Sequence, residues 1–114
     1  MARYLLLLQH RPGAFDDLNP DEMQEVVVRY RRWVERLREA GAYVASEKLA
    51  NTGRTLRGAS DRLRVSDGPY VEGKELIAGF YLLEAPSYES AVELARGCPV
   101  LERGIVEVRE ILAR

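Results

Sequence analysis

The sequence predicts an α+β fold, a ferredoxin-like βαββαβ sandwich with one extra small hairpin. Apolar runs of strand length alternate with two amphipathic helical stretches, in the order strand, helix, strand, hairpin, strand, helix, strand. The length of 114 residues fits a single domain, residues 1–114. Two β-α-β units in a chain this short are typical of an antiparallel sheet with both helices on one face.

The charge balance and the single cysteine limit the classes of function. The 17 Lys and Arg residues nearly balance 18 Asp and Glu residues, which gives a formal net charge of −1. This mixed charge offers no field to attract nucleic acid or an anionic membrane surface. One Cys and one His cannot build a structural zinc site or an internal disulfide. We therefore expect a cytoplasmic protein with no nucleic-acid partner, no membrane partner and no metal or cofactor.

The N-terminal half begins with a leucine run over residues 5–8. The run is too short for a signal peptide or a membrane span, and it predicts a central strand buried on both faces. Asn19 then supplies a helix cap, with Pro20 at the first helical position and Glu22 placed for a capping box. Apolar residues at three- and four-residue intervals predict an amphipathic helix that Gly41 ends.

The middle of the chain predicts strands and a polar hairpin. Residues 42–49 read as a strand, and residues 55–57 and 62–66 as the arms of the hairpin. We expect residues 67–69 to break that ladder, and residues 77–83 to form a second core strand. The predicted hairpin alternates apolar and polar residues, so it should be half-exposed.

The C-terminal part predicts a second helix and a last strand. Ser87 is placed to cap the helix, Gly97 and Pro99 end it, and residues 105–112 read as the strand. The open face of the resulting sheet is apolar in places, so it requires a cover. His10, the only histidine, stands at a strand end and reads as solvent-exposed.

A stretch in the second half carries a specific resemblance. The sequence reads DGPYVEGKE over residues 67–75, followed by IAGFYL over residues 77–82. It resembles the signature of the DGPF domain, a branch of the YCII-related family, with Tyr70 in place of the Phe. Residues 39–41 and 95–99, Gly104 and residues 106–109 match the same pattern, so the resemblance covers nearly the whole chain. Glu110 stands where the family pattern has Pro.

The resemblance implies a fold of the dimeric α/β-barrel type, in which two sheets pack face to face in a homodimer. It also implies a pocket with a His and Asp pair, but this chain has Tyr30 and Cys98 at those positions. Tyrosine has an ordinary pKa near 10 and is a poor general base at neutral pH. We expect Cys98 to remain a neutral thiol, since a helix C-terminus disfavours a thiolate.

Four residues are the candidate ligand-binding set: Tyr30, Asp67, Glu72 and Cys98. Asp67 and Glu72 each have a structural alternative. Asp67 before Gly-Pro commonly ties a turn by accepting backbone N–H bonds, and Glu72 with Lys74 reads equally as a solvated loop pair. No catalytic residue is assigned.

Two functions of different classes remain open. The first is a dimeric protein that binds a small organic molecule in a pocket, with a cofactor-independent acid–base enzyme as its catalytic variant. The second is a non-enzymatic interaction or regulatory module, because relatives implied by the resemblance occur beside alternative sigma factors. A pocket with convergent polar groups would favour the first, and a filled, pocketless dimer the second.

Overall fold

The computed structural model describes residues 1–69 and 75–113. The elements are β1 (Ala2–His10), α1 (Pro20–Glu39), β2 (Tyr43–Lys48), β3 (Arg54–Arg57), β4 (Arg64–Asp67), β5 (Leu76–Ala85), α2 (Tyr88–Ala95), the 3-10 helix η1 (Pro99–Glu102) and β6 (Gly104–Glu110). Four strands form an antiparallel sheet in the order β2-β5-β1-β6, and β3 with β4 forms a separate two-stranded ribbon. The predicted α+β, ferredoxin-like arrangement is confirmed.

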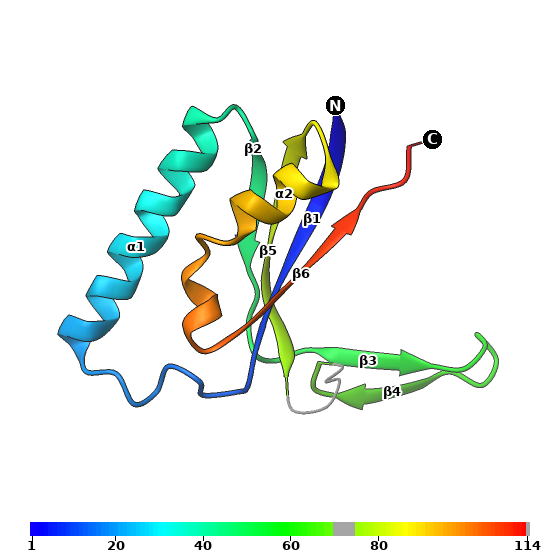
Figure 1. Ribbon diagram of the computed structural model, residues 1–114. Coiled ribbons are helices and arrows are strands. Elements are labelled where there is room, and N and C mark those ends of the chain that lie inside the picture. The colour runs from blue at the N-terminus through cyan, green and yellow to red at the C-terminus, as the bar shows by residue number, and fades with distance from the viewer. Residues whose placement is uncertain (70–74, 114) are drawn as a thin grey trace.

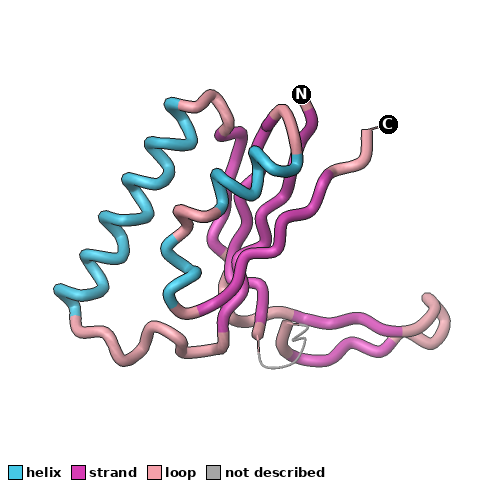
Figure 2. The backbone as a smooth tube through the Cα atoms, viewed as in Figure 1, coloured by secondary structure: helices cyan, strands magenta, loops and turns pink. Residues whose placement is uncertain are grey.

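The core lies between the sheet and the two helices, which cover the same face (Figures 1 and 2). Trp33 of α1 is fully buried there, and its indole Nε1 donates to the Leu94 carbonyl of α2 at 2.8 Å. Its ring packs edge-on against Tyr81 of β5, with centroids 4.6 Å apart. Trp33 therefore joins both helices to the sheet.

The caps of both helices form as predicted. Asn19 Oδ1 accepts from the Glu22 backbone N–H at 2.8 Å, while Glu22 Oε1 accepts from the Asn19 backbone N–H at 2.9 Å. Ser87 caps α2 by accepting from the Ser90 N–H at 3.1 Å. The short helix η1 was not predicted, because Pro99 was read only as a helix stop.

The central strand β1 is buried on one face only. Tyr4, Leu6 and Leu8 point into the helix-covered core and are buried, whereas Leu5 and Leu7 lie on the other face and are half-buried. The prediction of burial on both faces is wrong for the isolated chain, because no element of the described chain covers that side. β6 also ends at Glu110, two residues before the predicted end of the strand.

The ribbon of β3 and β4 projects from the lower end of the sheet, away from α1 (Figure 1). The predicted hairpin is thus present, but its ladder extends one residue further than expected. Asp67 pairs with Arg54 as the last rung instead of breaking the ladder. Leu56 and Val65 face each other across the ribbon and are 57% and 59% exposed.

Candidate functional site

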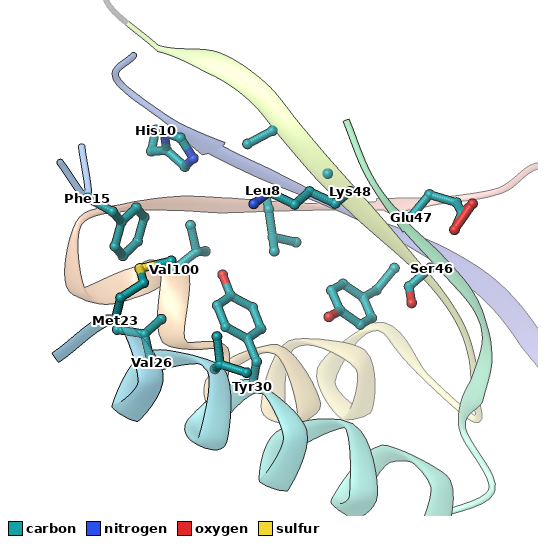
Figure 3. Close-up of a pocket in the computed structure, with 14 residues that line it drawn as sticks. Leu8, His10, Phe15, Met23, Val26, Tyr30, Ser46, Glu47, Lys48 and Val100 are labelled. Atoms are coloured by element: carbon teal, nitrogen blue, oxygen red, sulfur yellow. The ribbon is translucent and has the colours of Figure 1, made fainter. Parts of the chain in front are cut away.

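A pocket with a volume of about 460 Å³ opens between the N-terminal half of α1 and the helix-facing side of the sheet (Figure 3). Most of its lining is apolar. The apolar side chains are Leu8, Phe15, Met23, Val26, Val27, Ala78 and Val100. A few polar side chains interrupt this lining: His10, Tyr30, Ser46, Lys48 and Tyr81. An apolar cavity with a small number of polar groups is the usual form of a small-molecule site.

Tyr30 enters the pocket from the inner face of α1. It lies one turn after Val26, which is buried, and next to Trp33, so helix periodicity directs its ring toward the sheet. Figure 3 shows its hydroxyl turned into the space between α1 and the sheet. The same hydroxyl makes a hydrogen bond to the thiol of Cys98. The two residues from distant parts of the sequence therefore meet.

Burial controls the protonation of both groups. Burial, followed by the electrostatic effect of nearby Cys98, raises the pKa of Tyr30 well above its ordinary value of 10.0. Burial also raises the pKa of Cys98 to about 11, against the lowering effects of hydrogen bonds to Val100 and Tyr30. This raised pKa agrees with the neutral thiol that we expected at Cys98, although burial and not the helix terminus is its main cause. At neutral pH neither residue carries a charge.

The opposite wall of the pocket comes from β2 and β5. Tyr43 and Ser46 share a hydrogen bond of 2.7 Å, which fixes the Ser46 hydroxyl at the edge of the cavity. Figure 3 shows the Lys48 side chain extended toward the cavity, whereas Glu47 points away from it. Lys48 thus brings a positive charge to the pocket mouth.

Gly79 of β5 allows this wall to form. A Cβ atom at residue 79 would lie 3.0 Å from the Glu47 carbonyl oxygen and 3.6 Å from Lys48 Cα. A side chain here would push β2 away from β5 and narrow the cavity. The Gly79 in the resemblance motif therefore has a local packing role beside the pocket.

His10 lines the pocket near Phe15, contrary to the expectation of a solvent-exposed loop residue. Its imidazole packs edge-on against the Phe15 ring at a centroid distance of 5.4 Å. Its Nδ1 lies 2.8 Å from the Arg11 carbonyl oxygen, an acceptor, so Nδ1 carries the proton. In the neutral ring Nε2 is then left as the acceptor.

The other two predicted site residues do not reach the pocket in the described chain. Asp67 lies at the base of the ribbon, its side chain is 94% exposed, and its carboxylate pairs with Arg54 Nε at 3.4 Å. The turn beside it is held by other groups: the Gly68 N–H donates to the Gly53 carbonyl at 2.8 Å, and Thr55 Oγ1 donates to the Gly68 carbonyl at 2.9 Å. Glu72 falls outside the described residues, so its role stays a prediction.

Two further features concern metals and membranes. Within residues 1–69 and 75–113, no group of three or more His, Cys, Asp or Glu side chains is placed to hold a metal ion. In the same ranges, neither helix is both long and apolar enough to cross a bilayer.

Comparison with known families decides the affiliation of this fold. Residues 2–113 match the YCII-related domain. The chain belongs to the YCII-related family. In this YCII-related chain, Tyr30 and Cys98, which the resemblance predicts at the positions of a His and Asp pair, lie beside each other.

This YCII-related chain is similar to a bacterial protein in sequence and to a solved enzyme structure in fold. An uncharacterized protein from Rhizobium meliloti (strain 1021) is 37% identical over 62 residues, covering 47% of this chain and 50% of the relative. The chain thus matches only about half the length of that relative. Among solved structures, 5-chloro-2-hydroxyhydroquinone dehydrochlorinase from Burkholderia phenoliruptrix AC1100, in complex with 2,5-dihydroxybenzoquinone, has a TM-score of 0.54 at 14% identity. That alignment covers 96% of this chain and 93% of the neighbour, which supports the fold assignment.

Sequence reasoning missed several pocket residues, and for different reasons. Ser46 and Lys48 alternate along β2, so period-2 spacing could have placed both on the helix-covered face. His10 is the last residue of β1, two positions after buried Leu8, and the same alternation applies to it. For Tyr81, the buried partner Trp33 gives the signal only once the helix is docked.

Proposed function

We propose that this YCII-related chain binds a small organic molecule with an aromatic or otherwise apolar body and one or two polar substituents. The observation that carries the proposal is the pocket of about 460 Å³ in which polar groups converge on a mainly apolar cavity. This volume lies within the range common for small-molecule sites, roughly 300–1,000 Å³. In a regulatory module without a pocket, side chains would fill this space.

The lining suggests the chemistry of the ligand. The rings of Phe15, Tyr30 and Tyr81 favour a flat, apolar body. Lys48 favours an anionic or strongly hydrogen-bonding substituent, while Ser46 and the Tyr30 hydroxyl supply neutral hydrogen bonds. The dehydrochlorinase neighbour is in complex with 2,5-dihydroxybenzoquinone, a ring of this general kind, so that compound is a reasonable first probe.

A second candidate, cofactor-independent acid–base catalysis, is favoured by the position of His10. Its Nδ1–H is held by the Arg11 carbonyl, which leaves Nε2 able to accept a proton from a bound molecule. Tyr30 and Cys98 cannot take this role near neutral pH, because burial raises the pKa of each. If a reaction occurs, His10→Gln should abolish turnover while leaving ligand affinity within a few-fold of the unmodified chain.

We also propose that the protein functions as a homodimer that buries the open face of the sheet. Leu5 pairs with Leu82, and Leu7 with Phe80, so their side chains form one apolar patch on that face. Ile77 and Ile105 extend the patch and are 40% and 48% exposed. The patch is bordered by charges of both signs, Arg3 and Arg109 with Glu84 and Glu107.

A second copy fits this face better than an unrelated partner. An apolar centre with a mixed-charge rim is self-complementary, as a two-fold interface requires. The ribbon of β3 and β4 projects away from α1, on the side where the second copy would lie (Figure 1). We expect the dimer to bury about 1,200 Å² or more in total.

Thermal-shift and calorimetric titration with 2,5-dihydroxybenzoquinone, simple phenols and benzoates test ligand binding. Val27→Trp fills the pocket from α1, and Val92→Trp on α2 is the matched control, because these valines are 36% and 38% exposed. Binding by the chain and by Val92→Trp, with loss in Val27→Trp, supports the proposal. Equal binding by both variants places the ligand elsewhere and overturns the proposed pocket.

Light scattering at micromolar concentration tests the proposed homodimer, and a monomer mass contradicts it.

A further inference from the structure

A second hollow lies on the other side of Cys98, away from the ligand pocket. It is a groove of about 540 Å³ between α1 and the connection from α2 to η1. Cys98 lines this groove while its thiol contacts Tyr30, which lines the first pocket. The groove and that pocket have no lining residue in common within the described chain.

Four arginines line this groove, and they come from two separate elements. Arg29, Arg32 and Arg36 are spaced three and four residues apart on α1, so helix geometry places them along one face. Arg96 follows the last residue of α2 and faces them from the other side. We call these four residues the arginine cluster.

Acidic partners neutralise only part of the arginine cluster. Arg29 Nη2 donates to Glu102 Oε2 at 2.9 Å, and Arg96 Nε lies 2.8 Å from Glu93 Oε2. Arg32 and Arg36 have no acidic partner within the part of the chain that the structure describes. Four positive charges against these two carboxylates leave the groove with a net charge of +2.

Two packing features bear on whether these guanidinium groups bind a ligand. At Gly97, a Cβ atom would lie 2.9 Å from Trp33 Cδ1 and 3.1 Å from Arg36 Nη2, so the absence of a side chain leaves room for the core indole and also for that guanidinium. Arg29 Nε is buried without a hydrogen-bond partner in the described chain. The negative end of the α2 dipole favours Arg96 at its position. It does not account for Arg29 and Arg32 on the neighbouring helix.

We propose that the arginine cluster binds a phosphate group of a small molecule. A planar guanidinium offers paired N–H donors that match the oxygens of a phosphate, and several around one groove match its multiple charge. A nucleic-acid strand is a poorer occupant, since the chain as a whole has a net charge of −1. The site is distinct from the ligand pocket, and this inference does not depend on the proposed function.

Calorimetric titration of the full chain with inorganic phosphate and pyrophosphate, in dilute chloride buffer, tests the site. Pyrophosphate should bind more tightly than phosphate, because it presents more charge to the four guanidinium groups. The double variant Arg32→Gln with Arg36→Gln should weaken pyrophosphate binding at least tenfold. Arg31→Gln is the matched control, since Arg31 is an exposed arginine of the same helix outside the groove, and it should change the affinity less than twofold.

The remaining outcomes separate this proposal from its alternatives. Equal pyrophosphate affinity in the double variant and the unmodified chain overturns it. Citrate or an acidic peptide binding as tightly as pyrophosphate, with the same loss in the double variant, also overturns it in favour of a carboxylate or protein partner. Tyr30→Phe should leave phosphate binding unchanged, so failure here is distinguishable from failure of the ligand pocket.

Discussion

At the scale of single residues, a half-buried tyrosine of the pocket lies against a buried thiol. Both groups stay neutral at pH 7, because burial raises the pKa of Cys98 to about 11 and that of Tyr30 further above its ordinary value. Their contact is suited to orienting a ligand by neutral hydrogen bonds. His10 and Lys48 are the pocket residues suited to proton transfer or charge pairing.

Tyr30→Phe tests the hydrogen-bonding role of the tyrosine. Removing the hydroxyl deletes one neutral hydrogen bond to a ligand, so affinity should fall by about 0.5–1.5 kcal/mol with little change in fold. Tyr88→Phe is the control, because the Tyr88 hydroxyl donates to the Val108 carbonyl at 2.7 Å and does not line the pocket. A Tyr30→Phe affinity equal to that of Tyr88→Phe would show that the hydroxyl does not contact the ligand.

Asp67→Ala tests the structural alternative for the first residue of the DGPF-like motif. Its carboxylate is exposed and pairs with Arg54 at 3.4 Å, so the free energy of unfolding should change by no more than about 0.5 kcal/mol. Asn19→Ala serves as the positive control, since loss of a helix cap costs about 1 kcal/mol. Chemical denaturation that gives Asp67→Ala a cost of 1–3 kcal/mol would restore the turn role.

At the scale of elements, local patterns were sufficient for most of the fold. The capping box at Asn19, the Ser87 cap and the existence of strand β1 depend on neighbours in sequence, and all three were predicted. The end of the hairpin was not predicted correctly, because Asp67 pairs with Arg54 in the ribbon although Gly and Pro follow it. Cross-strand pairing depends on the partner strand, which a local pattern does not contain.

The candidate site was less predictable than the fold for the same reason. The Tyr30 and Cys98 pair came from the family resemblance, and the structure brings the two together. The arginine cluster was not predicted, because the sequence shows the spacing of Arg29, Arg32 and Arg36 but not the approach of Arg96. Only docking of α2 beside α1 brings the four charges to one groove.

The ribbon of β3 and β4 gives a prediction at this scale. A two-stranded ribbon with exposed apolar residues is marginal alone, so we expect Leu56 and Val65 to pack against the second copy of the chain. The double variant Leu56→Lys with Val65→Lys should weaken dimerisation at least tenfold by sedimentation. Ser66→Lys, on the other face of the ribbon, is the control. An unchanged dimer affinity in the double variant would exclude the ribbon from the interface.

At the scale of the whole molecule, the two faces of the sheet differ in character. One face carries the helices, the pocket and the core around Trp33, and the other presents the apolar patch of Leu5, Leu7, Phe80 and Leu82. Covering the second face with another copy would leave the pocket open, since the pocket lies on the helix side. Ligand binding and dimerisation can therefore be disrupted by separate substitutions.

The thiol of Cys98 and the phenol of Tyr81 also predict how stability depends on pH. Burial raises the pKa of Cys98 to about 11 and that of Tyr81 to about 12, so the unfolded chain releases these protons first as pH rises. Stability from these groups is complete below about pH 9 and is lost progressively between pH 9 and 12. Melting temperatures should fall over this range, and Cys98→Ala should fall less steeply than the unmodified chain. A flat profile up to pH 11 would contradict the burial of these groups.

The ligand pocket is the central claim, and nuclear magnetic resonance mapping tests it most directly. Amide and side-chain shifts are recorded while 2,5-dihydroxybenzoquinone or the best-binding phenol is added to the isotope-labelled chain. The account predicts saturable changes centred on His10, Tyr30, Ser46 and Gly79, and their loss in Val27→Trp but not in Val92→Trp. Changes centred instead on the open face at Leu5 and Phe80, or none with any probe that stabilises the chain, would contradict it.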